Sequence, residues 1–134
     1  MTILVTDQGF RPVPAESFVP LADLAQHQGA VDLAHTDDPA ALVDHLARLR
    51  VIRIGFPAFS DGRAFTIARR LRMAGFRGIL RANGPVIADQ YAMLRRVGFD
   101  EAEIPDALAS RQPQDQWQFR ADWQAHDYQA RLKA

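Results

Sequence analysis

VIRIGFPAFSDGRAFTIARRLRMAGFRGILRANGP, residues 51–85, is the stretch that decides the fold. It begins with a short apolar run at residues 51–56, which is typical of a buried strand. After Asp61, alanine, isoleucine and leucine recur every three or four residues as far as Gly75. This spacing predicts an amphipathic helix that is capped by the aspartate and ended by the glycine. Because residues 78–82 form another apolar run, the stretch is a predicted strand-helix-strand unit.

The same alternation continues on both sides of this unit. Residues 31–34 predict a strand, and Asp38-Pro39 is a typical helix start. Gly84-Pro85 is expected to open another helix, which Gly98 ends before a last strand at residues 101–104. A crossover helix returns the chain to the same end of the sheet, so successive strands run parallel. We therefore expect an α/β fold in which consecutive βα units form a small parallel sheet of about four strands, half-barrel-like or open.

The chain of 134 residues has the length of one α/β domain, residues 1–134. We expect a strand at residues 2–6 and a loop or hairpin within residues 1–30, the βα core at residues 31–104, and a tail at residues 105–134. The tail holds both tryptophans and fits either a strand or a helix, with its alanine and glutamine content favouring the helix. Because large aromatic rings rarely remain in water, we expect it to dock onto the domain or onto a second subunit. An unprotected sheet edge makes a homodimer plausible.

The composition excludes several classes of function. The chain has no cysteine, which excludes thiol catalysis, disulfides, thiolate zinc sites and protein-held iron–sulfur clusters. Its four histidines lack metal-ligand spacing, and no phosphate-binding loop or dinucleotide fingerprint is present, so we expect no metal and no cofactor. We expect Phe56, Phe59 and Phe65 to pack in the core rather than to flank a flavin ring. Without a leader or a long apolar run, the expected protein is cytoplasmic and does not contact a membrane.

The charge is unevenly distributed along the chain. The net charge is zero, yet residues 48–96 contain 11 arginines and only two acidic residues. Arginine suits the bidentate recognition of oxyanions, so this segment favours an anionic ligand or an acidic partner surface. The alternative is that most of these arginines lie on the solvated faces of helices. Nucleic acid is not an expected partner, because no recognition motif accompanies the basic segment.

The first candidate site is the predicted turn between the strand at residues 51–56 and the following helix. In an open parallel sheet, ligands bind beyond the carboxyl ends of the strands, where helix N-termini offer N–H groups. Asp61, Gly62 and Arg63 lie in this turn. An arginine at the positive end of a helix indicates an anion or a carboxylate that offsets it. The alternative is a local salt bridge between Asp61 and Arg63.

The second candidate site follows the strand at residues 78–82 and contains Arg81, Gly84, Asp89 and Gln90. A buried arginine requires a carboxylate, and Asp89 or Asp61 is the nearest along the chain. Arg81 is therefore either a ligand-binding group or half of an internal ion pair, and both readings stay open. If successive strands run parallel, the turns after residues 56 and 82 lie at one common rim.

The central motifs also resemble a known family. Phe56-Pro-x-Phe59-x-Asp61-Gly62-Arg63, Ala68-Arg69-x-Leu71-Arg72, Gly75-Phe76-x-Gly78, Leu80-Arg81-Ala82-x-Gly84, Asp89-Gln90 and Gly98-Phe99-Asp100 resemble the bacterial family called domain of unknown function 934. The resemblance covers roughly residues 31–104. It implies an accessory, oxidoreductase-associated protein of assimilatory sulfite reduction, because genes of this family tend to lie beside those for sulfite reductase. It carries over no catalytic residue, only the positions Asp61, Gly62, Arg63, Arg81, Gly84, Asp89 and Gln90.

Three functional hypotheses follow. The first is an accessory protein of sulfur assimilation that binds a small oxyanion or a sulfite-reduction enzyme. The second is an enzyme acting on a small anion, with Arg63 and Arg81 holding the oxyanion and Asp61 or Asp89 as acid or base. The third is a structural or oligomerising module whose arginines pair internally. Whether the protein is an enzyme remains open from the residues alone.

Overall fold

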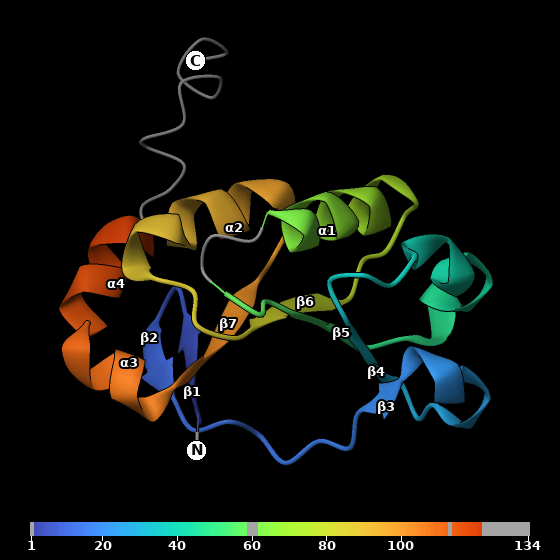
Figure 1. Cartoon of the computed structure of the whole chain (residues 1–134), viewed down its shortest axis with the longest axis horizontal. Coiled ribbons are helices and arrows are strands. Elements are labelled where there is room, and N and C mark those ends of the chain that lie inside the picture. Colours follow the sequence, from blue (N-terminus) through green and yellow to red (C-terminus); the bar gives the residue numbers. More distant parts are fainter. Residues whose placement is uncertain (1, 59–61, 113, 122–134) are drawn as a thin grey trace, which may run out of the picture.

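Seven strands form one sheet in the order β2-β1-β7-β6-β5-β4-β3 (Figure 1). The structure is a computed structural model that describes residues 2–58, 62–112 and 114–121, with side chains as far as Trp117. The strands are β1 (Thr2–Thr6), β2 (Gly9–Arg11), β3 (Val19–Pro20), β4 (Ala30–Leu33), β5 (Val51–Gly55), β6 (Ile79–Asn83) and β7 (Glu101–Pro105). The described helices are η1 (Leu21–Gln26), η2 (Pro39–Arg48), α1 (Arg63–Met73), η3 (Ala88–Gln90), α2 (Tyr91–Val97), α3 (Asp106–Arg111) and α4 (Gln114–Ala121).

Strands β3 to β7 are parallel and lie side by side in chain order. Each connection between them is a crossover, and right-handed crossovers between successive neighbours place every helix on the same face. Figure 1 shows α1 and α2 together above one face of the sheet, while the connection from β2 to β3 runs along the other side. The predicted α/β fold with consecutive βα units is confirmed.

The hydrophobic core lies between the sheet and these helices. Alternate residues of the central strands point to it, in keeping with the two-residue period of a strand, and they are Val31, Leu33, Ile52, Ile54, Leu80, Ala82, Ala102 and Ile104. The helices contribute the matching stripe of Ala64, Ile67, Ala68 and Leu71 from α1 and of Tyr91 and Leu94 from α2. The helical periodicity read from the sequence therefore identifies the buried side of α1.

The sheet has more strands than the four expected, because the N-terminal segment joins it at both edges. β1 forms a hairpin with β2 and pairs antiparallel with β7, in a register that places Thr2 opposite Pro105. β3 pairs with β4 at the other edge. The strand at residues 2–6 was predicted, whereas β2 and β3 have only three and two residues, too few for a periodic pattern to emerge.

Several helix ends differ from the prediction. Asp38 does cap the helix that begins at Pro39, accepting a hydrogen bond from the Ala40 N–H at 2.9 Å, but this helix is of the 3₁₀ type. α1 has Gly62 in the N-cap position, and the predicted cap Asp61 lies outside the described residues. After β6, the helix begins at Ala88 and not at Gly84, because the backbone before it is not helical: Gly84 has a φ of +144° and Ile87 is extended, with φ −100° and ψ 160°.

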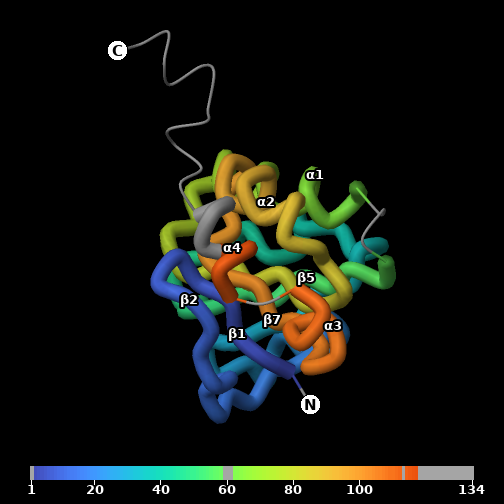
Figure 2. The backbone as a smooth tube through the Cα atoms, turned by 90° about the vertical axis from the view of Figure 1, so that its left-hand side faces the viewer, coloured from blue at the N-terminus to red at the C-terminus, as the bar shows by residue number. Residues whose placement is uncertain are grey.

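The predicted tail begins with two short helices, α3 and α4, and the preference for helix is confirmed over residues 114–121. Figure 2 shows α4 beside α2 and the β1-β2 hairpin. Trp117 docks on the domain and has only 1% of its surface exposed. Its ring packs edge-on against Tyr91, and its indole N–H donates a hydrogen bond to the Gln112 carbonyl at 2.9 Å. Trp123 lies outside the described residues.

Tyr91 joins this tail to the N-terminal hairpin. Its hydroxyl donates a hydrogen bond to the Asp7 carboxylate, which also lies 3.2 Å from the Arg95 guanidinium. Burial of the ring, and then the hydrogen bond to Asp7, raise the pKa of Tyr91 well above its ordinary value.

In the described part of the chain, no helix combines the length and the apolar character that crossing a membrane requires.

The raised pKa of Tyr91 predicts a loss of stability at alkaline pH. Tyrosine in the unfolded chain ionises near pH 10.0, whereas the folded protein keeps Tyr91 protonated, so the free energy of unfolding falls as the pH rises above that value. The contribution of one proton is a slope of about 1.4 kcal/mol per pH unit. Urea unfolding between pH 8 and 11 measures it, and Tyr91→Phe should have a pH slope that is shallower by this amount. If the free energies of unfolding of the wild type and of Tyr91→Phe fell with pH at the same slope, the raised pKa of Tyr91 would be contradicted.

Candidate functional site

The turns that follow β5 and β6 meet at one rim of the sheet. The Phe56 N–H donates to the Asn83 carbonyl at 2.8 Å, and the turn at Gly84 lies directly against this backbone. A Cβ atom at Gly84 would be 2.2 Å from the Phe56 carbonyl oxygen, and Gly84 has a φ of +144°. The two predicted site segments therefore share the carboxyl edge of the sheet, and only glycine permits such a close approach.

At the first segment, Gly62 and Arg63 occupy the exposed start of α1, and Asp61 lies outside the described residues. Phe56 is buried and packs edge-on against Phe65, with 5.3 Å between the ring centroids. These two phenylalanines belong to the core and its border, as expected, while Phe59 lies outside the described residues.

In the second segment, the predicted site residues do not lie together: Asp89 and Gln90 are in η3, whereas Arg81 is on the sheet. Asp89 is exposed and Gln90 is half-buried in η3, where the Gln90 carbonyl Oε1 accepts a hydrogen bond from the Ile87 N–H at 3.1 Å and so caps this short helix. Arg81 lies on the sheet face away from the helices and is only 4% exposed. Its guanidinium bonds Glu101 at 2.9 Å and Glu103 at 3.3 Å. Its charge is thus balanced inside the fold by two carboxylates of the neighbouring strand.

This ion pair is part of a larger charge ladder, which we define as Asp32, Arg53, Arg81, Glu101 and Glu103 across β4, β5, β6 and β7. Arg53 donates to both oxygens of Asp32 at 2.6 and 2.7 Å and lies 3.1 Å from Glu103. The hydrogen bond to Asp32, and the attraction of both carboxylates, raise the pKa of Arg53 above its ordinary value against the opposing effect of burial.

Two further residues complete the helix-free face. The Thr2 hydroxyl donates to Glu103 at 3.0 Å, which links β1 to the ladder. The Phe18 ring lies over the Arg53 guanidinium, with 4.0 Å between its centroid and the guanidinium carbon. This geometry allows a cation–π interaction, so Phe18 covers the ladder in the place that a helix would take in a doubly wound fold.

The ladder residues other than Arg81 were not identified from the sequence. A signal for them exists, because Arg53, Arg81 and Glu103 each stand between two apolar residues of a strand. In a strand buried on both faces, the alternate positions are also apolar. The alternation of charged and apolar residues therefore indicates that the second face of this sheet is polar.

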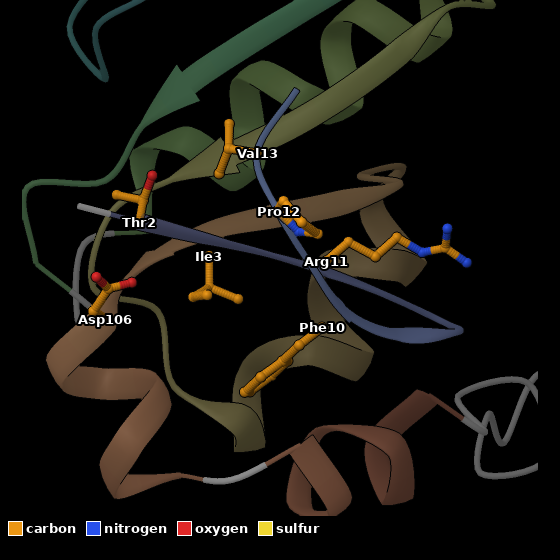
Figure 3. A pocket seen from close by; sticks show the side chains of 7 residues that line it. All are labelled: Thr2, Ile3, Phe10, Arg11, Pro12, Val13 and Asp106. Carbon is orange, nitrogen blue, oxygen red and sulfur yellow. The ribbon is translucent and has the colours of Figure 1, made fainter. Parts of the chain in front are cut away.

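Two hollows flank α3 at the carboxyl edge of the sheet. The first, about 650 Å³, lies between the β1-β2 hairpin and α3, and it is lined by Thr2, Ile3, Phe10, Arg11, Pro12, Val13 and Asp106. Figure 3 shows Ile3 and Phe10 in its centre and the Arg11 guanidinium directed away from them. The second, about 420 Å³, lies between the turn after β6 and α3, and it is lined by Pro85, Ile87, Pro105, Ala107, Leu108, Arg111 and Gln112.

An apolar groove crosses the helical side near the amino ends of the strands. Two hollows, of about 340 and 510 Å³, share Val43 and Ala74 and together form what we call the η2-α1 groove, whose apolar lining includes Val43, Leu46, Ala47, Leu71, Met73 and Ala74. Met73 and Val43 are 78% and 51% exposed. The described charged residues of this lining are Arg70 and Arg77, both basic. Exposed apolar surface bordered by charge is typical of protein interaction sites.

In the part of the chain that the structure describes, no group of three or more histidine, aspartate or glutamate side chains is arranged to hold a metal ion.

Residues 30–134 match the model of the family described as "Bacterial protein of unknown function (DUF934)". No curated protein matches the chain, and no solved structure does. The match includes both turns of the rim and every strand from β4 to β7, whereas the β1-β2 hairpin and Phe18 precede it.

Gly84→Ala should destabilise the protein by about 1–3 kcal/mol, because the added Cβ would strike the Phe56 carbonyl and a positive φ is strained for alanine. Gly62→Ala is the matched control, since its φ is −90° and nothing lies within 4 Å of the added atom. We expect its free energy of unfolding to change by less than about 1 kcal/mol. Thermal and urea unfolding of the two variants tests this contact. Equal stabilities would show that the two turns do not touch.

Glu103→Ala should be more damaging, because it leaves Arg81 buried with one carboxylate and removes a partner from Arg53 and Thr2. Breaking a buried ion pair costs about 3–5 kcal/mol. Glu16→Ala, which removes the 2.7 Å pair with the exposed Arg50, should cost less than about 1 kcal/mol. Urea unfolding of both variants gives the comparison, and a cost at Glu103 as small as that at Glu16 would contradict the role of the ladder.

Proposed function

The chain belongs to the bacterial family DUF934, and from this premise we propose that it is an accessory protein of assimilatory sulfite reduction that acts by docking onto a partner enzyme. The partner class follows from the gene association that the family resemblance implies. The choice of docking over anion binding at the predicted positions follows from Arg81, whose guanidinium already bonds Glu101 and Glu103.

The observation that carries the docking proposal is the η2-α1 groove. Met73 is the most exposed large apolar side chain of the described residues, and Val43 lies across the groove from it on η2. Burying such side chains against a partner gains about 25 cal/mol for each Å² of apolar surface removed from water. A free monomer gains nothing from exposing them, so an interface accounts for this surface.

The charges around the groove favour an acidic partner. Arg70 and Arg77 line it, and Arg69 lies one turn before Met73 on the exposed side of α1. Arg70 lies 3.4 Å from Asp38, but both side chains are more than half exposed, so this pair binds weakly and opens readily. The matching surface is an apolar patch with carboxylates at its border, on an enzyme of sulfite reduction.

Met73→Glu should weaken binding to sulfite reductase of the same bacterium by tenfold or more, because it places a carboxylate in the apolar centre of the interface and faces acidic groups. Met93→Glu is the matched control, since Met93 is a 52% exposed methionine on α2 and not part of the groove. Calorimetry with the purified proteins measures both affinities.

Rising salt should also weaken the wild-type complex, because screening reduces the attraction between basic and acidic borders. If the wild-type chain does not bind sulfite reductase, the proposed partner is wrong. If Met73→Glu and Met93→Glu bind sulfite reductase equally well, the η2-α1 groove is not the docking surface.

A further inference from the structure

The pocket between α3 and the turn after β6, which we call the rim pocket, lies where ligands of parallel sheets bind. Pro85 and Ile87 follow the carboxyl end of β6, and Pro105 ends β7. The rim pocket is thus at the opposite end of the strands from the η2-α1 groove, which borders Leu49 and Gly78 just before β5 and β6. Its volume of about 420 Å³ is in the range of small-molecule sites.

The lining has an apolar floor. Leu108 is buried, Ile87, Pro85 and Pro105 are half-buried, and Ala107 is exposed at the opening. Van der Waals contact with such a floor favours a ligand that has a hydrocarbon or aromatic body. A fully hydrated inorganic anion would gain little from it and would lose part of its water.

Two hydrogen-bond donors border this floor. Arg111, the last residue of α3, is exposed and forms no ion pair with any described residue. Gln112 is held in place, because its Oε1 accepts from the Ala88 N–H at 2.8 Å and its carbonyl accepts from the Trp117 indole at 2.9 Å. This orientation leaves the Gln112 Nε2 group, which donates to no described residue, as the remaining donor of the side chain.

The described lining contains no carboxylate, so its only formal charge is that of Arg111. In this it differs from the charge ladder and from the hollow between the β1-β2 hairpin and α3. Arg53 and Arg81 are balanced by acids within the charge ladder, and the neighbouring hollow on the other side of α3 includes Asp106. An unbalanced guanidinium beside an amide donor matches the two oxygens of a carboxylate.

From this combination we infer that the rim pocket binds a small organic carboxylate, with the carboxylate on Arg111 and Gln112 and an apolar body on Ile87 and Leu108. The site is independent of the proposed docking, since it uses other residues at the opposite end of the strands. It differs from the anion site predicted from the sequence in its cation, Arg111 in place of Arg81 or Arg63.

The test uses 4-phenylbutyrate as the probe, with 4-phenylbutanol as the same body without charge and acetate as the same charge without the body. Calorimetry with the full chain should show that phenylbutyrate binds at least tenfold more tightly than either comparator. Amide chemical shifts should change at residues 85–88 and 105–112 on titration. Absence of binding up to the solubility limit, or acetate binding equally well, would overturn the proposal.

Two variants separate charge from volume. Arg111→Met should reduce the affinity for phenylbutyrate to about that of the alcohol, and Ala107→Phe should abolish the binding of both by filling the opening from an exposed position. Arg48→Met, at an exposed arginine of η2, is the matched control and should bind as the wild type does. Unfolding curves confirm that each variant is folded. If phenylbutyrate bound both pocket variants as tightly as the wild type, the site would lie elsewhere.

Discussion

Glu103 lies on β7 and accepts hydrogen bonds from Thr2 on β1, Arg53 on β5 and Arg81 on β6. This carboxylate is needed because of how the chain connects its parallel strands. Successive right-handed crossovers place all the crossover helices on one face and leave the other face without a helical layer. Burying an arginine on that face without a carboxylate partner would cost too much free energy. The carboxylates of the charge ladder supply these partners, and the Phe18 ring covers Arg53. The surfaces that remain open are the carboxyl rim and the helical side.

The arginines of residues 48–96 have two different roles, some pairing inside the fold and others lying exposed at its surface, and composition alone does not tell them apart. Arg53 and Arg81 pair with acids on the sheet, and Arg72 donates to the carbonyls of Phe76, Gly78 and Gly98 and so ties α1 to the loops around it. Others, such as Arg77, stay exposed beside the η2-α1 groove. The local excess of positive charge is therefore partly internal and partly available to a partner.

Local patterns allowed the central βα units to be predicted, because a strand or an amphipathic helix is encoded within a few consecutive residues. The helix stripe of Ala64 to Leu71, the glycine after α1 and the shared rim all follow from such patterns. The partners of Arg81 could not be predicted in this way. Glu101 and Glu103 are 20 and 22 residues away, and only the register of β6 against β7 brings them to it. The rim pocket was missed for the same reason, since its walls come from the turn after β6 and from α3.

The antiparallel pairing of β1 with β7 also concerns the order in which the protein is made. Thr2 leaves the ribosome well before Pro105, the residue beside which it lies in the sheet. A two-stranded hairpin is barely stable in water by itself, so β1 and β2 must wait until β7 has emerged. During that interval Ile3 and Val5 have no β7 to pair with, and this segment of the nascent chain is available to any chaperone that recognises short apolar stretches.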